Sequence, residues 1–322
     1  MDSKNLYTPI QAELNQVTTI LGETHRDDLA PIQELLSYAM EVPGKLVRPA
    51  LTLLAAKCCG NAGMLHAVEV AAAVELLHMA SLIQDDTIDE ADVRRGRPTI
   101  NKIWGRDVAM LVGDFLFSKA AELTCKANDI RIIQSYAQAS KDAAAGELSE
   151  LLANFDITVT QERYMERIRA KTASLFSTAT ETGGLVSDAE TDQIEALKLY
   201  GIKVGLAFQI IDDVMDFKST ESKFGKPVVH DLSQGIITLP TILFIRDNPN
   251  NSLIQDAFQN INRAENLSLA IELIQQTDVL ARSYSMASQL IQEAQTALGI
   301  FEPSESLESL KGIAEYILDR DV

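Results

Sequence analysis

The chain has 322 residues, of which 46% are hydrophobic and 23% charged. This composition is that of a globular protein and excludes a disordered, collagen-like or disulfide-scaffold chain. The 46 acidic and 28 basic side chains give a net charge of −18, which repels nucleic acids, so no nucleic-acid partner is expected. An anionic substrate can bind only where metal ions or clustered Lys and Arg reverse the charge locally.

The N-terminus has no basic start followed by an apolar stretch, so we expect no secretory signal. The chain also lacks an uninterrupted apolar run of about 18 residues, so we expect no transmembrane segment. Both observations favour a cytoplasmic protein.

Apolar residues recur at spacings of three and four along most of the chain, which predicts helices. No run of β-branched residues alternates for long enough to predict a strand. Because no linker rich in Pro, Gly or Ser interrupts the pattern, residues 1–322 are expected to form a single all-α domain. In chain order, the expected helices cover residues 4–22, 28–41, 46–59, 63–90, 107–127, 131–154, 161–181, 191–217, 238–246, 265–298 and 305–319.

Two of these helices, 63–90 and 191–217, carry apolar residues on most sides, which predicts that both are buried. Each ends in the pattern DDxxD. Successive helical residues are about 100° apart, so the second and third carboxylates lie about 100° and 40° from the first and project from one side of the helix. The first cluster consists of Asp85, Asp86 and Asp89, and the second of Asp212, Asp213 and Asp216.

Three like charges at a helix C-terminus are unfavourable unless a cation compensates for them. Carboxylate oxygens are hard ligands that suit Mg²⁺, which completes its coordination with water and substrate phosphates. A single DDxxD is more often a solvated helix end. Two of them, each closing a buried helix and each followed by a loop with basic residues at 92–99 or 219–235, indicate a metal-dependent site for a diphosphate.

The chain resembles the trans-isoprenyl diphosphate synthases, or polyprenyl synthetases, of the medium- and long-chain type. The resemblance runs from about Gly44 to Arg320 and implies the isoprenoid synthase fold, an all-α bundle of about 10–13 helices around a central cavity. It rests on GKLVRP at 44–49, ELLHMASLIQDDTIDEADVRRGRPT at 75–99, GDFLF at 113–117, GE at 146–147, KT at 171–172, FQIIDDVMD at 208–216 and GKP at 225–227, in the order of the family.

The resemblance implies a site for an allylic prenyl diphosphate. It assigns the binding of Mg²⁺, three ions per active site, to Asp85, Asp86, Asp89, Asp212 and Asp216, with Asp213 in a supporting role. It places Arg94, Lys171 and Lys226 on the same diphosphate. Loss of the diphosphate leaves an allylic carbocation, which Thr172 and Gln209 are expected to face.

The second substrate, isopentenyl diphosphate, needs an anion pocket without metal ions, and Lys45, Arg48, His78 and Arg95 resemble the family's residues for it. His78 precedes Asp85 by seven residues, which is two helical turns and within about 20° of the same face. A lone histidine on an apolar helix is usually a core residue, but this shared face favours a ligand role. The proton lost after bond formation is expected to go to the released pyrophosphate, since no side-chain base stands out.

Product length should depend on how far the growing tail extends along helix 63–90. Ser81 lies about 6 Å before Asp85 and nearly in line with it, and Ala80 lies beside Ser81. Both are small, whereas short-chain relatives are expected to have an aromatic residue here. Leu77 and Val74, about 12 and 16 Å back, are the next restrictions. We therefore expect an all-trans product of at least C20, with C30 or longer favoured, built on farnesyl or geranylgeranyl diphosphate.

Three residues depart from the family pattern. Gln84 replaces a frequent His, Glu150 a frequent Gln, and Ile236 a frequent Lys. Because both aspartate clusters are present, we expect activity nonetheless. The resemblance also implies a homodimer, and the apolar residues of 107–127 are compatible with a subunit interface.

Several alternatives stay open. The chain could be the catalytic subunit of a heteromeric prenyl synthase or, less favoured, an inactive regulatory subunit. A terpene cyclase should lack the second DDxxD and the pocket from Lys45 to Arg48. A di-iron bundle needs two E-x-x-H motifs, and only Glu75 to His78 spells one.

Overall fold

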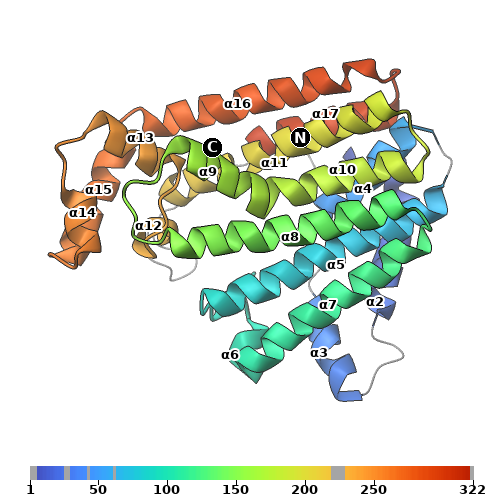
Figure 1. The fold of residues 1–322 in the computed structure, drawn as a ribbon, viewed down its shortest axis with the longest axis horizontal. Coiled ribbons are helices and arrows are strands. Elements are labelled where there is room, and N and C mark those ends of the chain that lie inside the picture. Colours follow the sequence, from blue (N-terminus) through green and yellow to red (C-terminus); the bar gives the residue numbers. More distant parts are fainter. Residues whose placement is uncertain (1–5, 25–29, 42–43, 61–62, 219–228, 320–322) are drawn as a thin grey trace. The chain divides into compact units, whose positions relative to one another are not determined.

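The structure is a computed structural model that describes residues 6–24, 30–41, 44–60, 63–218 and 229–319. These residues are almost entirely helical (Figure 1), which confirms the predicted all-α class. They divide into two compact units, each assembled from separate chain segments. The first unit comprises Met1–Lys141, Leu175–Gly201 and Ala297–Ile313, and the second comprises Asp142–Ser174, Ile202–Thr296 and Ala314–Val322. The expected single domain over 1–322 stays a prediction.

The first unit holds most of the N-terminal half of the chain. Its elements are η1 Thr8–Ile10, α2 Gln11–Glu23, α3 Ala30–Met40, α4 Val47–Cys58, α5 Met64–Ile88, β1 Val93–Arg94, β2 Arg97–Pro98, α6 Ile100–Trp104, α7 Arg106–Lys126, nearly all of α10 Ser174–Val186, and η3 Leu298–Ile300.

The second unit holds α9 Gln161–Ile168, the π turn η2 Arg169–Ala173, α12 His230–Ser233, α13 Leu239–Asp247, α14 Leu253–Phe258, α15 Arg263–Gln276 and nearly all of α16 Val279–Ala297. Three helices contribute residues to both units: α8 Ile130–Leu152, α11 Thr191–Lys218 and α17 Glu305–Leu318.

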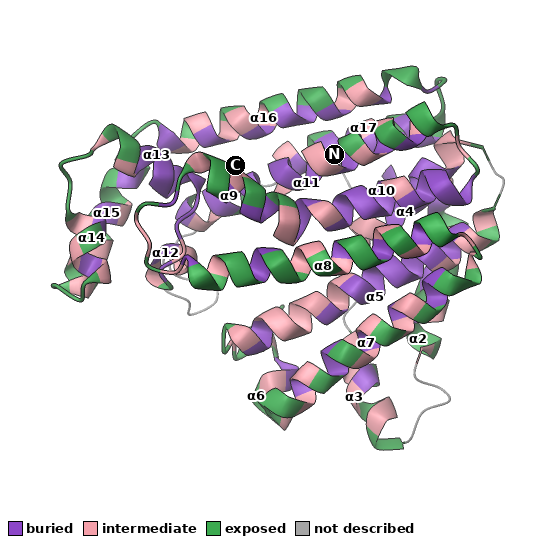
Figure 2. Ribbon diagram, viewed as in Figure 1, coloured by how far each residue is buried: buried purple, intermediate pink, exposed green. Residues whose placement is uncertain are grey.

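The α5 helix forms the core of the first unit because its apolar residues leave no polar face. It packs against α2, α4 and α7, and its N-terminal two-thirds is largely buried (Figure 2). By length and composition alone α5 could also cross a membrane, although 61% of its apolar window is buried. A buried core helix passes the same test, so the expected absence of a transmembrane segment stays a prediction.

The C-terminus of α5 turns the chain sharply. The Asp89 N–H donates to the Asp85 carbonyl at 2.8 Å and the Ala91 N–H to the Asp86 carbonyl at 2.9 Å, while Glu90 adopts a left-handed φ of 52°. This is a Schellman motif, which satisfies the last carbonyl groups of a helix. It leads from the first aspartate cluster directly into the arginine-bearing segment.

The described residues contain sixteen α-helices, more than expected, because α6, α12 and α14 are too short to show a periodic pattern. Three expectations also differ in detail. The helix expected at 161–181 is interrupted by η2, and that expected at 265–298 breaks at Thr277, which is extended. The loop expected at 92–99 contains the β1–β2 hairpin.

Candidate active site

The first aspartate cluster lies at the end of α5, and its three carboxylates are unequally exposed. Asp89 is exposed, Asp85 is partly buried and Asp86 is only 6% exposed. The Asp86 carboxylate is compensated for its burial by Arg94, whose Nε donates a hydrogen bond to Oδ2 at 2.7 Å. The structure therefore joins an expected metal ligand to an expected diphosphate ligand in one ion pair.

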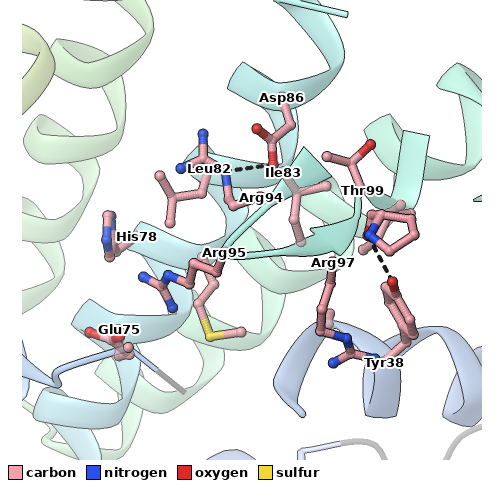
Figure 3. Close-up of a pocket in the computed structure, with 15 residues that line it drawn as sticks. Tyr38, Glu75, His78, Leu82, Ile83, Asp86, Arg94, Arg95, Arg97 and Thr99 are labelled. Carbon is pink, nitrogen blue, oxygen red and sulfur yellow. Dashed lines mark hydrogen bonds and ion pairs between the residues drawn. The ribbon is translucent and has the colours of Figure 1, made fainter. Parts of the chain in front are cut away.

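A two-residue turn between β1 and β2 presents the adjacent arginines. Val93 pairs with Pro98 and Arg94 with Arg97, so Arg95 and Gly96 form the turn, with φ of 52° and 77°. Two positive φ values are typical of a type I′ hairpin turn. The turn separates the two side chains: Arg94 contacts Asp86, whereas Arg95 lies between His78 and Glu75 (Figure 3).

A cavity of about 110 Å³ lies beside this hairpin. Its polar lining contains more positive than negative groups. Apolar side chains of α5 and α6 complete the wall, so the cavity offers an anion site next to an apolar surface. The charged lining residues are Arg94, Arg95, Arg97, Glu75 and Asp86, together with His78, Tyr38 and Thr99.

Burial shifts the pKa values of His78 and Glu75, the two titratable groups of α5 nearest Arg95, and the arginines modify these shifts. Burial lowers the pKa of His78 well below its usual range, and the charges of Arg48, Arg95 and Arg94 lower it further. His78 is therefore neutral at physiological pH and can donate one hydrogen bond. Burial raises the pKa of Glu75, while Arg48 and Arg95 act in the opposite direction.

The GKLVRP motif approaches the same cavity. A Cβ atom on Gly44 would lie 3.0 Å from Nη2 of Arg95, so any side chain at this position would displace the guanidinium by a few tenths of an ångström or more. Cζ of Arg48 lies 4.5 Å from the centre of the Phe176 ring, a cation–π contact. Lys45 is exposed, and neither it nor Arg48 belongs to the lining of the cavity as described, whereas His78 and Arg95 do.

The second aspartate cluster lies near the end of α11 and is held by hydrogen bonds within the second unit. Asp212 is exposed, whereas Asp213 is 2% exposed. The two carboxylate oxygens of Asp213 accept from the Tyr164 hydroxyl at 2.6 Å and from Nε2 of Gln209 at 2.9 Å. Burial raises the pKa of Asp213 to about 7, against the effect of these hydrogen bonds. The Asp216 carboxylate accepts from the backbone N–H groups of His230 and Asp231, each at 3.2 Å.

Lys171 lies in the π turn η2 and is held by two carboxylates of α8. Its Nζ is 2.6 Å from Oε2 of Glu147 and 2.5 Å from Oε1 of Glu150. A Cβ on Gly146 would lie 2.5 Å from the Lys171 backbone nitrogen, so α8 and η2 meet backbone to backbone. Arg167, whose side chain is 4% exposed, lies 3.6 Å from Glu150. The lysine is thus part of a mostly buried charge network.

Thr172 and Gln209 are linked to this network. The Thr172 hydroxyl donates to Oε1 of Gln209 at 2.7 Å, and the Gln209 amide in turn donates to Asp213. Thr172 therefore keeps an acceptor lone pair for another contact. Lys226 lies outside the part of the chain that the structure describes.

The residues expected to limit product length lie along α5. Ala80, Leu77 and Val74 are each at most 1% exposed. Ser81 is partly buried, and its hydroxyl donates to the His78 carbonyl at 2.8 Å. No aromatic side chain occupies these positions, as the sequence shows.

The donor chemistry of both clusters fits magnesium, because carboxylate oxygens are its preferred protein ligands. Among the described residues, no three His, Cys, Asp or Glu side chains converge to form a ready-made metal site. Magnesium does not need one, since it commonly uses one or two carboxylates and completes its shell with water and substrate phosphate. Asp89 and Asp212 are exposed to such an ion.

Sequence reasoning missed several residues of these networks. Tyr164 and Arg167 carry no motif; Tyr164 donates to Asp213, 49 residues away, and Arg167 donates to the Ile237 carbonyl, 70 residues away. Burial raises the pKa of Asp231 well above its usual range, and the nearby charges of Asp213, Asp216 and Glu150 reinforce this. The only available signal for Asp231 was an acidic residue in the loop expected at 219–235. Glu75 begins the motif at 75–99 and is half of an E-x-x-H pattern, but neither pattern predicts its place beside Arg95.

Comparison with known proteins extends over the whole chain. A family model described as polyprenyl synthetase matches residues 30–276. Component 2 of heptaprenyl diphosphate synthase from Geobacillus stearothermophilus is 33% identical over 321 residues, which is 100% of both chains.

Two crystal structures are also similar. Decaprenyl diphosphate synthase from Rhodobacter capsulatus has a TM-score of 0.92 and 32% identity over 99% of each chain. Polyprenyl synthase from Caulobacter crescentus CB15, complexed with calcium and isoprenyl diphosphate, has a TM-score of 0.93 and 32% identity over 100% of this chain and 98% of the other. These likenesses confirm the expected isoprenoid synthase fold.

Proposed function

Because the chain belongs to the polyprenyl synthetase family, we propose that it is an all-trans polyprenyl diphosphate synthase with a product of C30 or longer. It is a prenyltransferase that joins isopentenyl diphosphate head to tail onto an allylic diphosphate, with farnesyl or geranylgeranyl diphosphate as the starter. The long product is supported by the similarity to heptaprenyl and decaprenyl synthases. The small side chains of Ala80 and Ser81 also support it, because a bulky side chain there would stop a growing tail.

The observation that carries this proposal is the arginine-lined cavity of the first unit. Arg95 and neutral His78 would bind the diphosphate of isopentenyl diphosphate, and Lys45 and Arg48 of the neighbouring motif would add charge. Arginine suits this role because its forked donors match phosphate oxygens. A terpene cyclase binds a single diphosphate and has no use for a second, metal-independent anion site.

Magnesium for the allylic diphosphate would be held by Asp85, Asp86 and Asp89 of the first unit and by Asp212 and Asp216 of the second. Bound Mg²⁺ supplies Lewis-acid stabilisation of the departing diphosphate. Lys171, Arg94 and Lys226 add fixed positive charge to the same group. The Thr172 hydroxyl, oriented by Gln209, faces the carbocation with its oxygen.

A second candidate function is the catalytic component of a heteromeric synthase. The observation that favours it is the end-to-end alignment with a relative named as component 2 of its enzyme. For the first candidate, we propose a homodimer in the cytoplasm that binds three Mg²⁺ ions per active site. A subunit contact on α7 is supported by Leu111, which is 67% exposed there.

One experiment separates these candidates. The purified chain alone is incubated with Mg²⁺, farnesyl diphosphate and labelled isopentenyl diphosphate, and the dephosphorylated products are chromatographed. A ladder ending at C30 or longer is expected. Absence of elongation by the lone chain would reject the first candidate and favour the heteromer.

A second experiment tests what limits product length. Ser81→Phe should shorten the product, and an unchanged length would refute the proposal that the growing tail extends along α5.

A further inference from the structure

The hairpin that carries Arg94 and Arg95 cannot be stable by itself. Each strand has two residues, and even complete two-stranded hairpins are marginal in water. Arg95 also adopts a left-handed φ of 52°, which is unfavourable for a residue with a side chain. Such a conformation persists only when surrounding contacts impose it.

The hairpin is held next to α5 by contacts at its base, where the chain enters at residues 91–94 and leaves at Thr99. Arg94 pairs with Asp86 at 2.7 Å. The Thr99 N–H donates to the Asp92 carbonyl at 3.0 Å, and the Thr99 hydroxyl donates to the Ala91 carbonyl at 2.7 Å. These bonds close the base of the hairpin, but none of them involves β2.

The β2 strand is held by α3 instead. The Tyr38 hydroxyl donates to the Pro98 carbonyl at 2.7 Å (Figure 3). Cζ of Arg97 lies 4.4 Å from the centre of the Tyr38 ring, and the Tyr38 and Trp104 rings meet edge to face at 5.0 Å. Nη2 of Arg97 is 2.6 Å from Oε2 of Glu41. Tyr38 thus contacts both residues of β2.

These contacts are expected to contribute unequally to the stability of the hairpin. The Glu41 side chain is 63% exposed and that of Arg97 is 32% exposed, and an exposed ion pair contributes little. The Tyr38 hydrogen bond to Pro98 is exposed as well, but the Tyr38 side chain is partly buried, lines the cavity and contacts Pro98, Arg97 and Trp104 together. Within the described part of α3, Leu36 is the buried side chain, so α3 has little apolar anchoring apart from this contact.

We propose that Tyr38 is a positioning residue for substrate binding. By fixing both residues of β2, it keeps Arg95 in the left-handed conformation that directs its guanidinium into the cavity between His78 and Glu75. Arg95 can then bind the diphosphate of isopentenyl diphosphate without reorganising. This inference rests on the proposed function of the cavity, and it assigns to α3 a role in the affinity for one of the two substrates.

The test is Tyr38→Phe, which removes one hydroxyl and keeps the ring. A hydrogen bond of this kind changes an equilibrium about three- to tenfold. We therefore expect the KM for isopentenyl diphosphate to rise by about that factor, with kcat and the KM for the allylic substrate unchanged. Glu41→Gln should act in the same direction but less than twofold.

Tyr136→Phe is the matched control. Its hydroxyl also donates to a backbone carbonyl, that of Phe117 at 2.5 Å, in the same unit, but Tyr136 does not line the cavity. Both variants should lower the Tm by no more than about 4 °C, and Tyr136→Phe should leave both KM values unchanged. An unchanged KM for isopentenyl diphosphate in Tyr38→Phe, or an equal rise for both substrates, would overturn the proposal.

A binding measurement separates this inference from the proposed function. Inorganic pyrophosphate is titrated calorimetrically into the full chain in EDTA, where only protein cations can bind it. Weaker binding by Tyr38→Phe than by Tyr136→Phe supports the positioning role even if the wild-type chain does not elongate any prenyl substrate. Equal binding by both variants refutes that role even if the chain is an active synthase.

Discussion

The cavity of the first unit and the Lys171 network of the second unit have opposite charge balances. The cavity brings Arg94, Arg95 and Arg97 together with neutral His78, and Arg48 adds a further cation nearby, against the carboxylates of Glu75 and Asp86 in the lining and of Glu41, which pairs with Arg97. The network holds two cations, Lys171 and Arg167, among a larger number of acidic groups. These are Glu147, Glu150, Asp213, Asp216 and Asp231.

This difference in charge balance explains how an acidic chain can bind two diphosphate groups. A diphosphate can enter the cavity unaided because the local charge is already positive. The second unit repels a diphosphate until cations are added, since Lys171 is engaged by two carboxylates. We therefore expect one substrate to bind without metal ions and the other to depend on them.

The largest expected effect comes from removing the metal. With EDTA, turnover should fall at least about a thousandfold, because the Lewis-acid contribution is worth several kcal/mol. Binding of isopentenyl diphosphate, measured by calorimetry, should persist. Loss of that binding in EDTA, or turnover that survives chelation, would show that the two regions do not differ as described.

Removing Arg95 should selectively weaken the cavity. A hydrogen bond to a charged group is worth about 1.5–3 kcal/mol, so Arg95→Ala should raise the KM for isopentenyl diphosphate about 10- to 100-fold. Arg95→Lys should recover only part of the loss, because lysine lacks the fork of donors. Steady-state kinetics with each substrate varied in turn measures the effect, and a comparable rise for the allylic substrate would contradict it.

Relieving the acidic surroundings of Lys171 should have a smaller, opposite effect. Glu150→Gln keeps the shape but removes one carboxylate at 2.5 Å from Nζ, so the KM for the allylic diphosphate should fall about two- to fivefold. Glu166→Gln, an exposed position on α9, is the control and should change nothing. An allylic KM that rises in Glu150→Gln would show that this carboxylate assists binding.

A last expected effect is on stability rather than turnover, and it concerns pH and His78. Its folded-state pKa is well below the ordinary value of 6.5, so below that pH the unfolded chain binds a proton that the native chain does not. Stability should therefore fall as pH decreases below 6.5, by up to about 1.4 kcal/mol per pH unit from this group. Urea denaturation at pH 7.5 and 5.5 should show a flatter dependence in His78→Gln than in the control His66→Gln.

Much of the fold could be predicted from apolar spacing alone. The two buried helices expected at 63–90 and 191–217 are α5 at 64–88 and α11 at 191–218. The helical segment expected at 161–181 is helical throughout, but it contains a π turn at 169–173, which coincides with the backbone contact between Gly146 and Lys171. That contact joins two separate segments of the chain, α8 and η2, and the spacing of apolar residues within one segment cannot predict it.

The candidate site was predicted as a set of residues rather than as a set of contacts. Motifs identified Asp86 and Arg94 separately, yet their ion pair depends on the Schellman turn and the hairpin that follow α5. Tyr38 stands in no recognised motif, and the motif at 75–99 that contains Arg97 gives no sign of its contact with Tyr38. Their roles arise from an aromatic ring meeting a guanidinium across 59 positions of chain, an arrangement that only the folded molecule displays.

The close fit of Gly44 beneath Arg95 has an evolutionary consequence. Since a Cβ at position 44 would lie 3.0 Å from the guanidinium, even alanine would push Arg95 aside by a few tenths of an ångström. The size of the side chain at position 44 would therefore set the affinity for isopentenyl diphosphate, although no charged residue is replaced. Selection, or a protein engineer, could match the enzyme to scarce or plentiful five-carbon building blocks by that route.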